Sequence, residues 1–231
     1  MRIDIATLFP EMCEAVLSES IIGRARKSGA VEIYCHNIRD YAFDKHRRTD
    51  DTPYGGGMGM VMKAEPIFLC WQAVCESLQE KPWSIYLSPQ GHVLNQAKTM
   101  ELSHRENLFL LCGHYEGVDQ RVLDTIIDEE ISVGDYVLTG GELPALVLAD
   151  SIVRTCPGVL PNAACFEEES HFHGLLEHPQ YTKPDTWQGQ SVPEVLLSGH
   201  HLKISQWRTQ ESLRVTQEKR PDLYQAWLDK N

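Results

Sequence analysis

The chain has 231 residues, of which 42% are hydrophobic, and a formal net charge of −12 from 33 acidic against 21 basic residues. This length suits one large domain, or one domain with a small appendage. The acidic balance excludes a generic nucleic-acid-coating protein, although a local basic patch can still hold a specific RNA. The seven cysteines form no C-x-x-C pair, and no apolar run suits a signal peptide or a membrane span. We therefore expect a cytoplasmic protein with reduced thiols and no membrane attachment.

Strands alternate with helices along the first two thirds of the chain. A strand is expected at 2–8, then one helix from 10 to about 29, and a second strand at 31–37. Short apolar runs predict further strands at 83–87, at 108–112 and up to Ile131, and helices are expected at 65–79, 95–106, 118–127 and 142–155. This alternation indicates an α/β fold with a largely parallel sheet.

Three of these strands end in glycine-bearing loops. The first loop is Ser88-Pro89-Gln90-Gly91, the second runs from Gly113 to Gly117, and the third follows Ile131 with the sequence SVGDYVLTGGELP. Because the carboxyl ends of parallel strands share one edge of a sheet, we expect a single crevice there. The loops form neither a dinucleotide-binding fingerprint nor a P-loop. No Lys or Arg lies within a glycine turn, so the crevice suits a nucleoside better than a triphosphate.

The character of the chain changes after Pro157. Residues 158–186 carry prolines, three consecutive glutamates and several histidines without a sustained period, which is typical of a linker or a functional loop. From Pro193 onward the pattern is helical, over 193–197, 200–217 and 221–228. This tail is too small to bury a large core of its own.

Two further constellations have alternative interpretations. The glycine loop PYGGGMGMVM at 53–62 can present several N–H groups to an anion or to RNA, or it can be a flexible turn. Its basic neighbours at 45–48 are largely offset by nearby aspartates. His171, His173 and His178 lie close to the glutamates at 167–169, but no H-E-x-x-H motif is present and zinc prefers ligands on firm secondary structure.

Arg154 stands at the end of the helix expected at 142–155. An arginine there ordinarily pairs with the last carbonyl groups of the helix. Its second interpretation is functional, because a carboxylate from the 167–169 run beside a guanidinium could act as a general base.

Taken together, the segments resemble the bacterial tRNA (guanine-N1)-methyltransferases of the SPOUT superfamily. The matching stretches, in family order, are HRRTDDTPYGGGMGMVMK, LSPQG, LCGHYEGVDQRV, EISVGDYVLTGGELPALVLADSIVR, PGVL, GLLEHPQYTKP and VPEVLLSGHH. The resemblance implies an α/β domain over 1–158 whose parallel sheet carries a deep trefoil knot. It also implies an interdomain linker over 159–186 with the catalytic base, and a small all-α domain over 187–231 that binds tRNA.

The resemblance further implies S-adenosylmethionine as methyl donor, bound in the knot by the three loops. The implied cofactor residues are Tyr86, Leu87, Ser88, Pro89, Gly91, Gly113, Tyr115, Glu116, Ile131, Ser132, Val133, Gly134, Asp135, Tyr136, Val137, Leu138, Gly140, Gly141 and Pro144. The implied substrate is a tRNA with guanosine directly 3′ of the anticodon, held by a homodimer with shared active sites.

The implied chemistry needs a carboxylate and an arginine. Guanine N1 carries a proton that a base must remove, while a cation stabilises the charge on the adjacent carbonyl oxygen. Counting back from GLL places Glu169 at the base position, where the family usually has Asp, and Glu168 stays an alternative; Arg154 matches the cation. The implied substrate contacts are Glu116, Arg154, Ser170, His46 and His201. Cys165 and Glu177 replace a frequent Ser and a frequent Asp. The family's Mg²⁺ requirement points to the acidic segment, without a ligand set.

Three other functions compete with this one. A ribose methyltransferase of the same superfamily would not depend on Glu169. A non-catalytic module would bind S-adenosylmethionine without turnover. A metal hydrolase using His171 and His173 would contain zinc.

Overall fold

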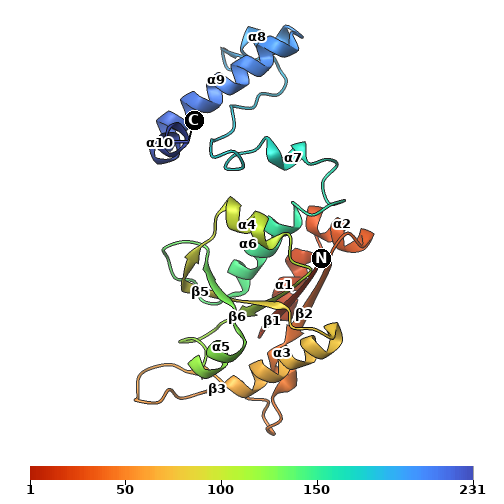
Figure 1. Ribbon diagram of the computed structural model, residues 1–231, viewed down its shortest axis with the longest axis vertical. Helices are drawn as coiled ribbons and strands as arrows, with labels where there is room; N and C mark the ends of the chain where they lie inside the picture. Colours follow the sequence, from red (N-terminus) through yellow and green to blue (C-terminus); the bar gives the residue numbers. More distant parts are fainter. Residues whose placement is uncertain (231) are drawn as a thin grey trace. The chain divides into compact units, whose positions relative to one another are not determined.

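The computed structural model describes residues 1–230, which group into two compact units, Met1–Asn162 and a second that begins at Ala163. The first unit contains a five-stranded sheet in the order β2-β1-β6-β5-β7, with every neighbouring pair parallel (Figure 1). Its strands are β1 (Arg2–Thr7), β2 (Glu32–Asn37), β5 (Trp83–Val93), β6 (Asn107–Cys112) and β7 (Glu129–Ser132). The prediction of an α/β fold with a parallel sheet is therefore confirmed.

Helices cover both faces of the sheet. Side chains alternate along each strand, so one strand contributes residues to the apolar clusters on both faces. In β6, Leu108 and Leu110 belong to one apolar cluster, whereas Phe109 and Leu111 belong to the other. The first cluster is completed by α1 (Pro10–Leu17), α2 (Ser20–Ser28), α4 (Gln96–Leu102) and α6 (Glu142–Val153). The second is completed by η1 (Ile38–Tyr41), α3 (Ala64–Leu78) and α5 (Gln120–Ile126).

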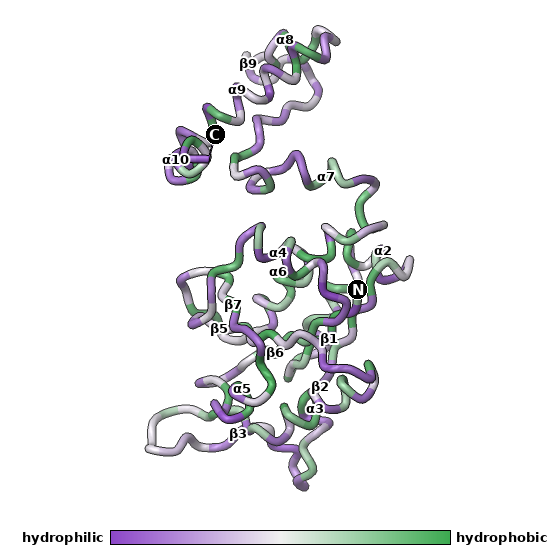
Figure 2. Tube along the Cα trace, viewed as in Figure 1, coloured by the Kyte–Doolittle hydropathy of each residue, from purple (hydrophilic) through white to green (hydrophobic). Residues whose placement is uncertain are grey.

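The glycine loop lies outside this layered core. A short antiparallel pair, β3 (Asp50–Asp51) and β4 (Val61–Met62), flanks it. Figure 1 shows the loop projecting from the sheet, and Figure 2 shows it mostly pale, since glycine is neither strongly apolar nor strongly polar. Of the helices between residues 1 and 230, none combines the length and the apolar character that crossing a membrane requires.

Three predicted boundaries were wrong. The helix expected from 10 to 29 is two helices, because Glu19 is extended and Ser20 has a φ of 54°. Gly23 permits this close turn, since a Cβ there would lie 2.2 Å from the carbonyl oxygen of Ser18. Strand β5 continues to Val93 rather than ending at 87. Helix α4 ends at Leu102 rather than at 106.

The second unit contains α7 (Ala164–Glu167), α8 (Glu194–Leu197), α9 (His201–Lys219) and α10 (Pro221–Leu228), with a short antiparallel pair, β8 (Thr186–Trp187) and β9 (Gln190–Ser191). The three predicted C-terminal helices are present. Leu176, in the segment expected to be a linker or a functional loop, is attached to α9, because its N–H donates to Thr216 Oγ1 at 2.9 Å and its carbonyl oxygen accepts from Ser212 Oγ.

Candidate active site

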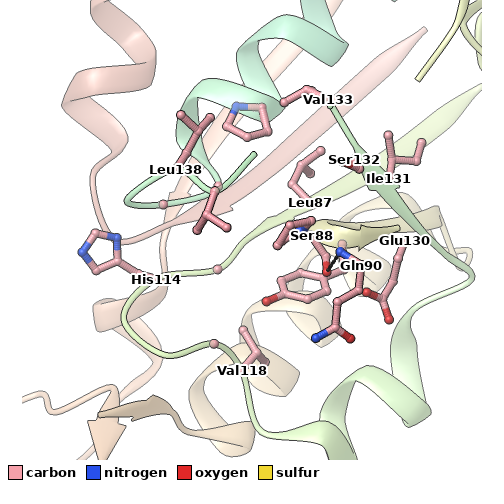
Figure 3. A pocket seen from close by; sticks show the side chains of 18 of the residues that line it. Leu87, Ser88, Gln90, His114, Val118, Glu130, Ile131, Ser132, Val133 and Leu138 are labelled. Atoms are coloured by element: carbon pink, nitrogen blue, oxygen red, sulfur yellow. Dashed lines mark hydrogen bonds between the residues drawn. The ribbon is translucent and has the colours of Figure 1, made fainter. Parts of the chain in front are cut away.

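A cavity of about 340 Å³ opens beside residues 86–90 of β5 and at the carboxyl ends of β6 and β7. Its lining includes all the cofactor residues implied by the resemblance except Gly91 and Asp135. Figure 3 shows Leu87, Ser88, Gln90, Glu130 and Ile131 gathered on one side of the cavity, with His114 and Leu138 on the other. Eight lining residues are not among the implied cofactor residues: Gln90, His114, Gly117, Val118, Gln120, Leu123, Glu130 and Thr139. Gln90, His114, Gly117 and Thr139 belong to the three loops that the sequence predicts to form the crevice, whereas the other four lie outside those loops.

The first loop is a bulge within β5 rather than the end of a strand. Leu87 and His92 both stand opposite Ile131, so the residues between them leave the ladder, and three of these, Ser88, Pro89 and Gln90, line the cavity. Ser88 Oγ accepts a hydrogen bond from the Gln90 N–H at 3.1 Å, which closes the bulge. A Cβ on Gly91 would lie 2.4 Å from the Glu130 carbonyl carbon, so this glycine is needed against β7 and not in the cavity wall.

The second loop packs aromatic rings around a buried polar atom. The His114 ring lies 5.0 Å from the Phe9 ring and 4.8 Å from the Tyr115 ring. Tyr115 has a φ of 58°, a left-handed conformation that a residue with a side chain adopts at some cost. His114 Nδ1 is buried and has no hydrogen-bond partner within residues 1–230. Beneath the loop, burial raises the pKa of Tyr86 to about 12, so its phenol stays protonated.

Ser132 ends β7 and Glu142 begins α6, so the third loop proper is residues 133–141, which cross from the β7 edge of the sheet to the start of α6. Gly141 is its contact with the second loop, because its N–H donates to the Gly113 carbonyl oxygen at 2.8 Å. A Cβ on Gly141 would lie 2.7 Å from the Cys112 Cα, so the two backbones can approach this closely only at a glycine. In the middle of the loop Tyr136 and Val137 are exposed.

The electrostatics of the cavity favour a ligand with positive charge. Glu116 and Glu130 are part of its wall, whereas the described lining contains no Lys or Arg. Apolar side chains and close backbone suit an adenosine, and the carboxylates suit a sulfonium or ammonium group. These residues fit S-adenosylmethionine and do not fit a polyphosphate nucleotide.

The glycine loop at 53–62 is joined to this site through Glu116. The Glu116 N–H donates to the Met60 carbonyl oxygen at 3.0 Å, and the Met62 N–H donates to the Gly117 carbonyl oxygen at 2.9 Å. A Cβ on Gly59 would lie 2.5 Å from Glu116 Oε1. Four glycines here have positive φ angles, at positions 55, 56, 57 and 59. The C-terminal end of the loop is therefore held beside a cavity-lining carboxylate.

The expected catalytic and substrate residues lie in both units. Arg154 caps the C-terminus of α6 in the first unit, is half-buried, and donates its N–H to the Asp150 carbonyl oxygen at 3.1 Å. In the second unit the Glu169 N–H donates to the Phe166 carbonyl oxygen at 3.3 Å, and Ser170 Oγ accepts from the Glu177 N–H at 2.9 Å.

Two predicted substrate residues are exposed. His46, in the first unit, precedes β3, does not line the cavity, and donates its backbone N–H to Asp44 Oδ1 at 3.2 Å. His201 is the first residue of α9, in the second unit.

The histidines near the glutamate run do not form a metal centre. Within residues 1–230, no group of three or more His, Cys, Asp or Glu side chains is arranged to hold a metal ion. His171 instead donates its backbone N–H to the Leu175 carbonyl oxygen at 2.8 Å, in a turn. The metal-hydrolase hypothesis therefore has no support in the geometry of this segment.

Comparisons with known proteins agree along nearly the whole chain. A family model described as tRNA (Guanine-1)-methyltransferase TrmD matches residues 1–226. A curated tRNA (guanine-N(1)-)-methyltransferase of Ruminiclostridium cellulolyticum is 57% identical over 231 residues, which are 100% of this chain and 99% of that protein. The relative of the same name from Clostridioides difficile is 51% identical over 231 residues, with 100% of both chains covered. That from Chloroflexus aurantiacus is 52% identical over 223 residues, which are 96% of this chain and 88% of the relative.

Proposed function

The chain belongs to the tRNA (guanine-N1)-methyltransferase family, and from this premise we propose that it methylates N1 of the guanosine immediately 3′ of the tRNA anticodon, with S-adenosylmethionine as methyl donor. One observation carries the proposal beyond the family name. The three glycine-bearing loops converge on a cavity that has carboxylates but no described Lys or Arg in its wall. Such a site suits a cationic adenosine ligand.

Binding and orientation are the first tasks of the chain. When bound, S-adenosylmethionine supplies a methyl group on a positively charged sulfur that is open to in-line displacement. The backbone of the second and third loops holds the ligand, and Glu116 and Glu130 offset its positive charge. Because orientation contributes much of the rate in such a displacement, rigid loops matter more than additional chemical groups.

Proton transfer is the second task. We assign Glu169 as the base that takes the proton from guanine N1, and Arg154 as the cation that stabilises charge on the adjacent carbonyl oxygen. Glutamate performs the same transfer as the aspartate usual at this position, with its carboxyl displaced by roughly 1 Å, a shift that can alter the rate. Glu168 is the alternative base.

Substrate binding involves both units of the chain. Glu116 reaches the target guanine, with Ser170, His46 and His201 as further tRNA contacts and the C-terminal helices as the tRNA-binding domain. The link between Glu116 and the glycine loop supports an RNA-facing role for that loop. Magnesium, which the resemblance also implies, finds no group of ligands within residues 1–230, so no step is assigned to it. The tRNA substrate supports a cytoplasmic location.

An apolar surface supports the homodimer with shared active sites. Met12 and Val16 on α1 are 43% and 49% exposed, and Leu143 and Val147 on α6 are 47% and 51% exposed. The two helices pack against each other, so these side chains can form one continuous patch. Exposed apolar side chains grouped in this way are typical of an interface between subunits.

The path of the third loop supports the trefoil knot. The loop leaves β7 at one edge of the sheet, and the helix that follows begins beside β1, two strands beyond β5 in the sheet order. Its backbone comes close to the second loop at Gly141, as the passage of one part of the chain past another in a knot would require. Such a crossing departs from the rule that connections do not thread through loops.

The decisive experiment measures methyl transfer from labelled S-adenosylmethionine to two tRNA transcripts. One carries guanosine 3′ of the anticodon, and the other carries adenosine there. We expect label in the first only, mapped as 1-methylguanosine. Label in both would place the target elsewhere in the tRNA, and label on a ribose would favour the ribose methyltransferase. Cofactor binding without transfer to either tRNA would favour the non-catalytic module, unless a Glu169→Asp variant restores the activity.

A further inference from the structure

Glu142 is a buried carboxylate that the proposed mechanism does not use. It is the first residue of α6, it is 4% exposed, and it does not line the cavity. Thr7, at the end of β1, donates its hydroxyl proton to Glu142 Oε1 at 2.7 Å. The same Thr7 Oγ1 accepts a hydrogen bond from the Phe9 N–H at 2.9 Å. Because a buried carboxylate without a partner is costly, this side chain is held firmly in place.

The Thr7–Glu142 hydrogen bond lies at one end of the third loop. At the other end, Ser132 Oγ donates to the Gly134 carbonyl oxygen at 2.9 Å and accepts from the Gly134 N–H at 3.1 Å. The loop between them crosses the sheet from β7 to β1, and Val137 in its middle is 81% exposed. Because the middle of the loop makes few buried contacts, its position depends on how its two ends are held.

The second oxygen of the Glu142 carboxylate faces the cavity wall. A Cβ on Gly140 would lie 2.4 Å from Glu142 Oε2 and 2.7 Å from His114 Nδ1, so both atoms crowd the same point. Gly140 and His114 are both lining residues, and the Phe9 ring packs against the His114 ring. The carboxylate therefore supports the second and third loops from behind, while Thr7 ties it to the sheet.

We propose that Glu142 and Thr7 are positioning residues that set the affinity of the cavity for its adenosine ligand without touching it. Their hydrogen bond fixes the end of the third loop to β1 and holds Gly140 and Gly141 at the distance from the second loop that the ligand requires. The inference rests on the proposed function, because S-adenosylmethionine is taken as the ligand. It predicts a loss of ligand affinity when the hydrogen bond is removed, with the rate at saturating ligand preserved.

The test compares Thr7→Val, which keeps the shape of the side chain and removes its hydroxyl, with Thr7→Ser, which keeps the hydroxyl. Calorimetric titration with S-adenosylmethionine alone is expected to show a Kd at least about tenfold higher for Thr7→Val and close to wild type for Thr7→Ser. The Glu142→Met variant tests the acceptor side, because it keeps the length of the side chain and removes both carboxylate oxygens. The double variant Thr7→Val/Glu142→Met should have a Kd no higher than that of the weaker-binding single variant, because both changes remove the same hydrogen bond.

Thr99→Val is the matched control. Thr99 is also buried in the first unit, and its hydroxyl bonds to Ser151 Oγ at 3.4 Å, away from the cavity. We expect this variant to lose some thermal stability and to keep the wild-type Kd. A Kd for Thr7→Val within twofold of wild type, or an equal rise in Thr99→Val, would overturn the inference. If wild type itself does not bind S-adenosylmethionine, the proposed function fails and not this inference alone.

Steady-state methyl transfer gives a second readout. The KM for S-adenosylmethionine should rise in Thr7→Val with little change in kcat, and Thr7→Ser should restore it. A fall in kcat at unchanged KM would contradict the positioning role. If Thr7→Val does not fold, the Kd of Glu142→Met decides the question, and a wild-type value there would reject the proposal.

Discussion

The phenol oxygen of Tyr86 lies 2.7 Å from the point where a side chain on Gly113 would begin. Two carbons of the same ring lie at 2.9 and 3.2 Å from that point. Tyr86 belongs to β5 and Gly113 follows β6, the neighbouring strand, so the contact joins two walls of the cavity. A glycine is therefore required at position 113, because the Tyr86 ring occupies the space that a side chain would need.

Gly113→Ala should displace the Tyr86 ring from the cavity wall. We expect destabilisation of about 1–3 kcal/mol, as for overpacked cores, together with weaker binding of S-adenosylmethionine. Urea unfolding and calorimetric titration measure the two effects. The double variant Gly113→Ala/Tyr86→Phe lacks the phenol oxygen, the nearest atom, and should recover part of the lost stability. If the destabilisations of the two single variants instead add in full, the Tyr86 ring does not clash with a side chain at position 113.

Gly59→Ala should reduce catalysis through Glu116. A Cβ on Gly59 would collide with that side chain, whereas a Cβ on Gly56 would meet nothing within 4 Å. Both glycines have a φ near +80°, at 86° and 80°, so alanine carries a similar backbone cost of about 1 kcal/mol at either position. We expect Gly59→Ala to lower methyl transfer to tRNA at least about tenfold more than Gly56→Ala. Equal losses in a single-turnover assay would assign the effect to backbone strain.

Tyr86 should make the protein less stable in alkali. Burial, with smaller contributions from Glu130 and Cys112, raises the pKa of Tyr86 from 10.0 in the unfolded chain to about 12. Below pH 10 both states keep the proton. Above it the unfolded state loses the proton first, so stability falls as pH rises, by about 2 kcal/mol at pH 12. Chemical unfolding between pH 9 and 12 measures the free energy of unfolding of wild type and of Tyr86→Phe. Plotted against pH, the wild-type values should fall below those of Tyr86→Phe as the pH rises above 10. Parallel curves would mean that Tyr86 ionises freely.

Glu169→Gln should abolish most methyl transfer, because an amide cannot take the proton from guanine N1. We expect a loss of at least about 100-fold in the single-turnover rate, with binding of S-adenosylmethionine unchanged. Glu168→Gln is the matched control and should stay near wild type. Glu169→Asp should remain active, since it restores the residue usual in the family. The opposite ranking of the two glutamine variants would assign the base to Glu168.

Val147→Glu should separate the subunits of the proposed homodimer. A charge in the middle of an apolar interface is costly to bury, so the variant should sediment as a monomer and lose activity. Leu202→Glu is the control, because Leu202 is 74% exposed but lies in the helical unit and not on α1 or α6. Analytical ultracentrifugation of both variants gives the answer. A dimeric Val147→Glu protein would move the interface to another surface.

The amino-acid sequence by itself determined the class of fold and the place of the cavity. Continuous apolar runs such as 108–112 are long enough for a strand that is buried on both faces. The alternation of these strands with helices predicts a parallel sheet. The glycines at the strand ends then indicated a crevice at one edge. These features follow from local periods and turn residues, which a sequence records directly.

Only the tertiary structure decided which distant residues meet. Gly91 and Gly59 look like ordinary turn residues in the sequence, but one is required by the backbone of β7 and the other lies against Glu116. Thr7 and Glu142 are 135 residues apart and meet because α6 begins beside β1. A sequence pattern carries the period of each element but not the distance between elements. Contacts of this kind are therefore decided by packing, which brings together side chains that no local signal relates.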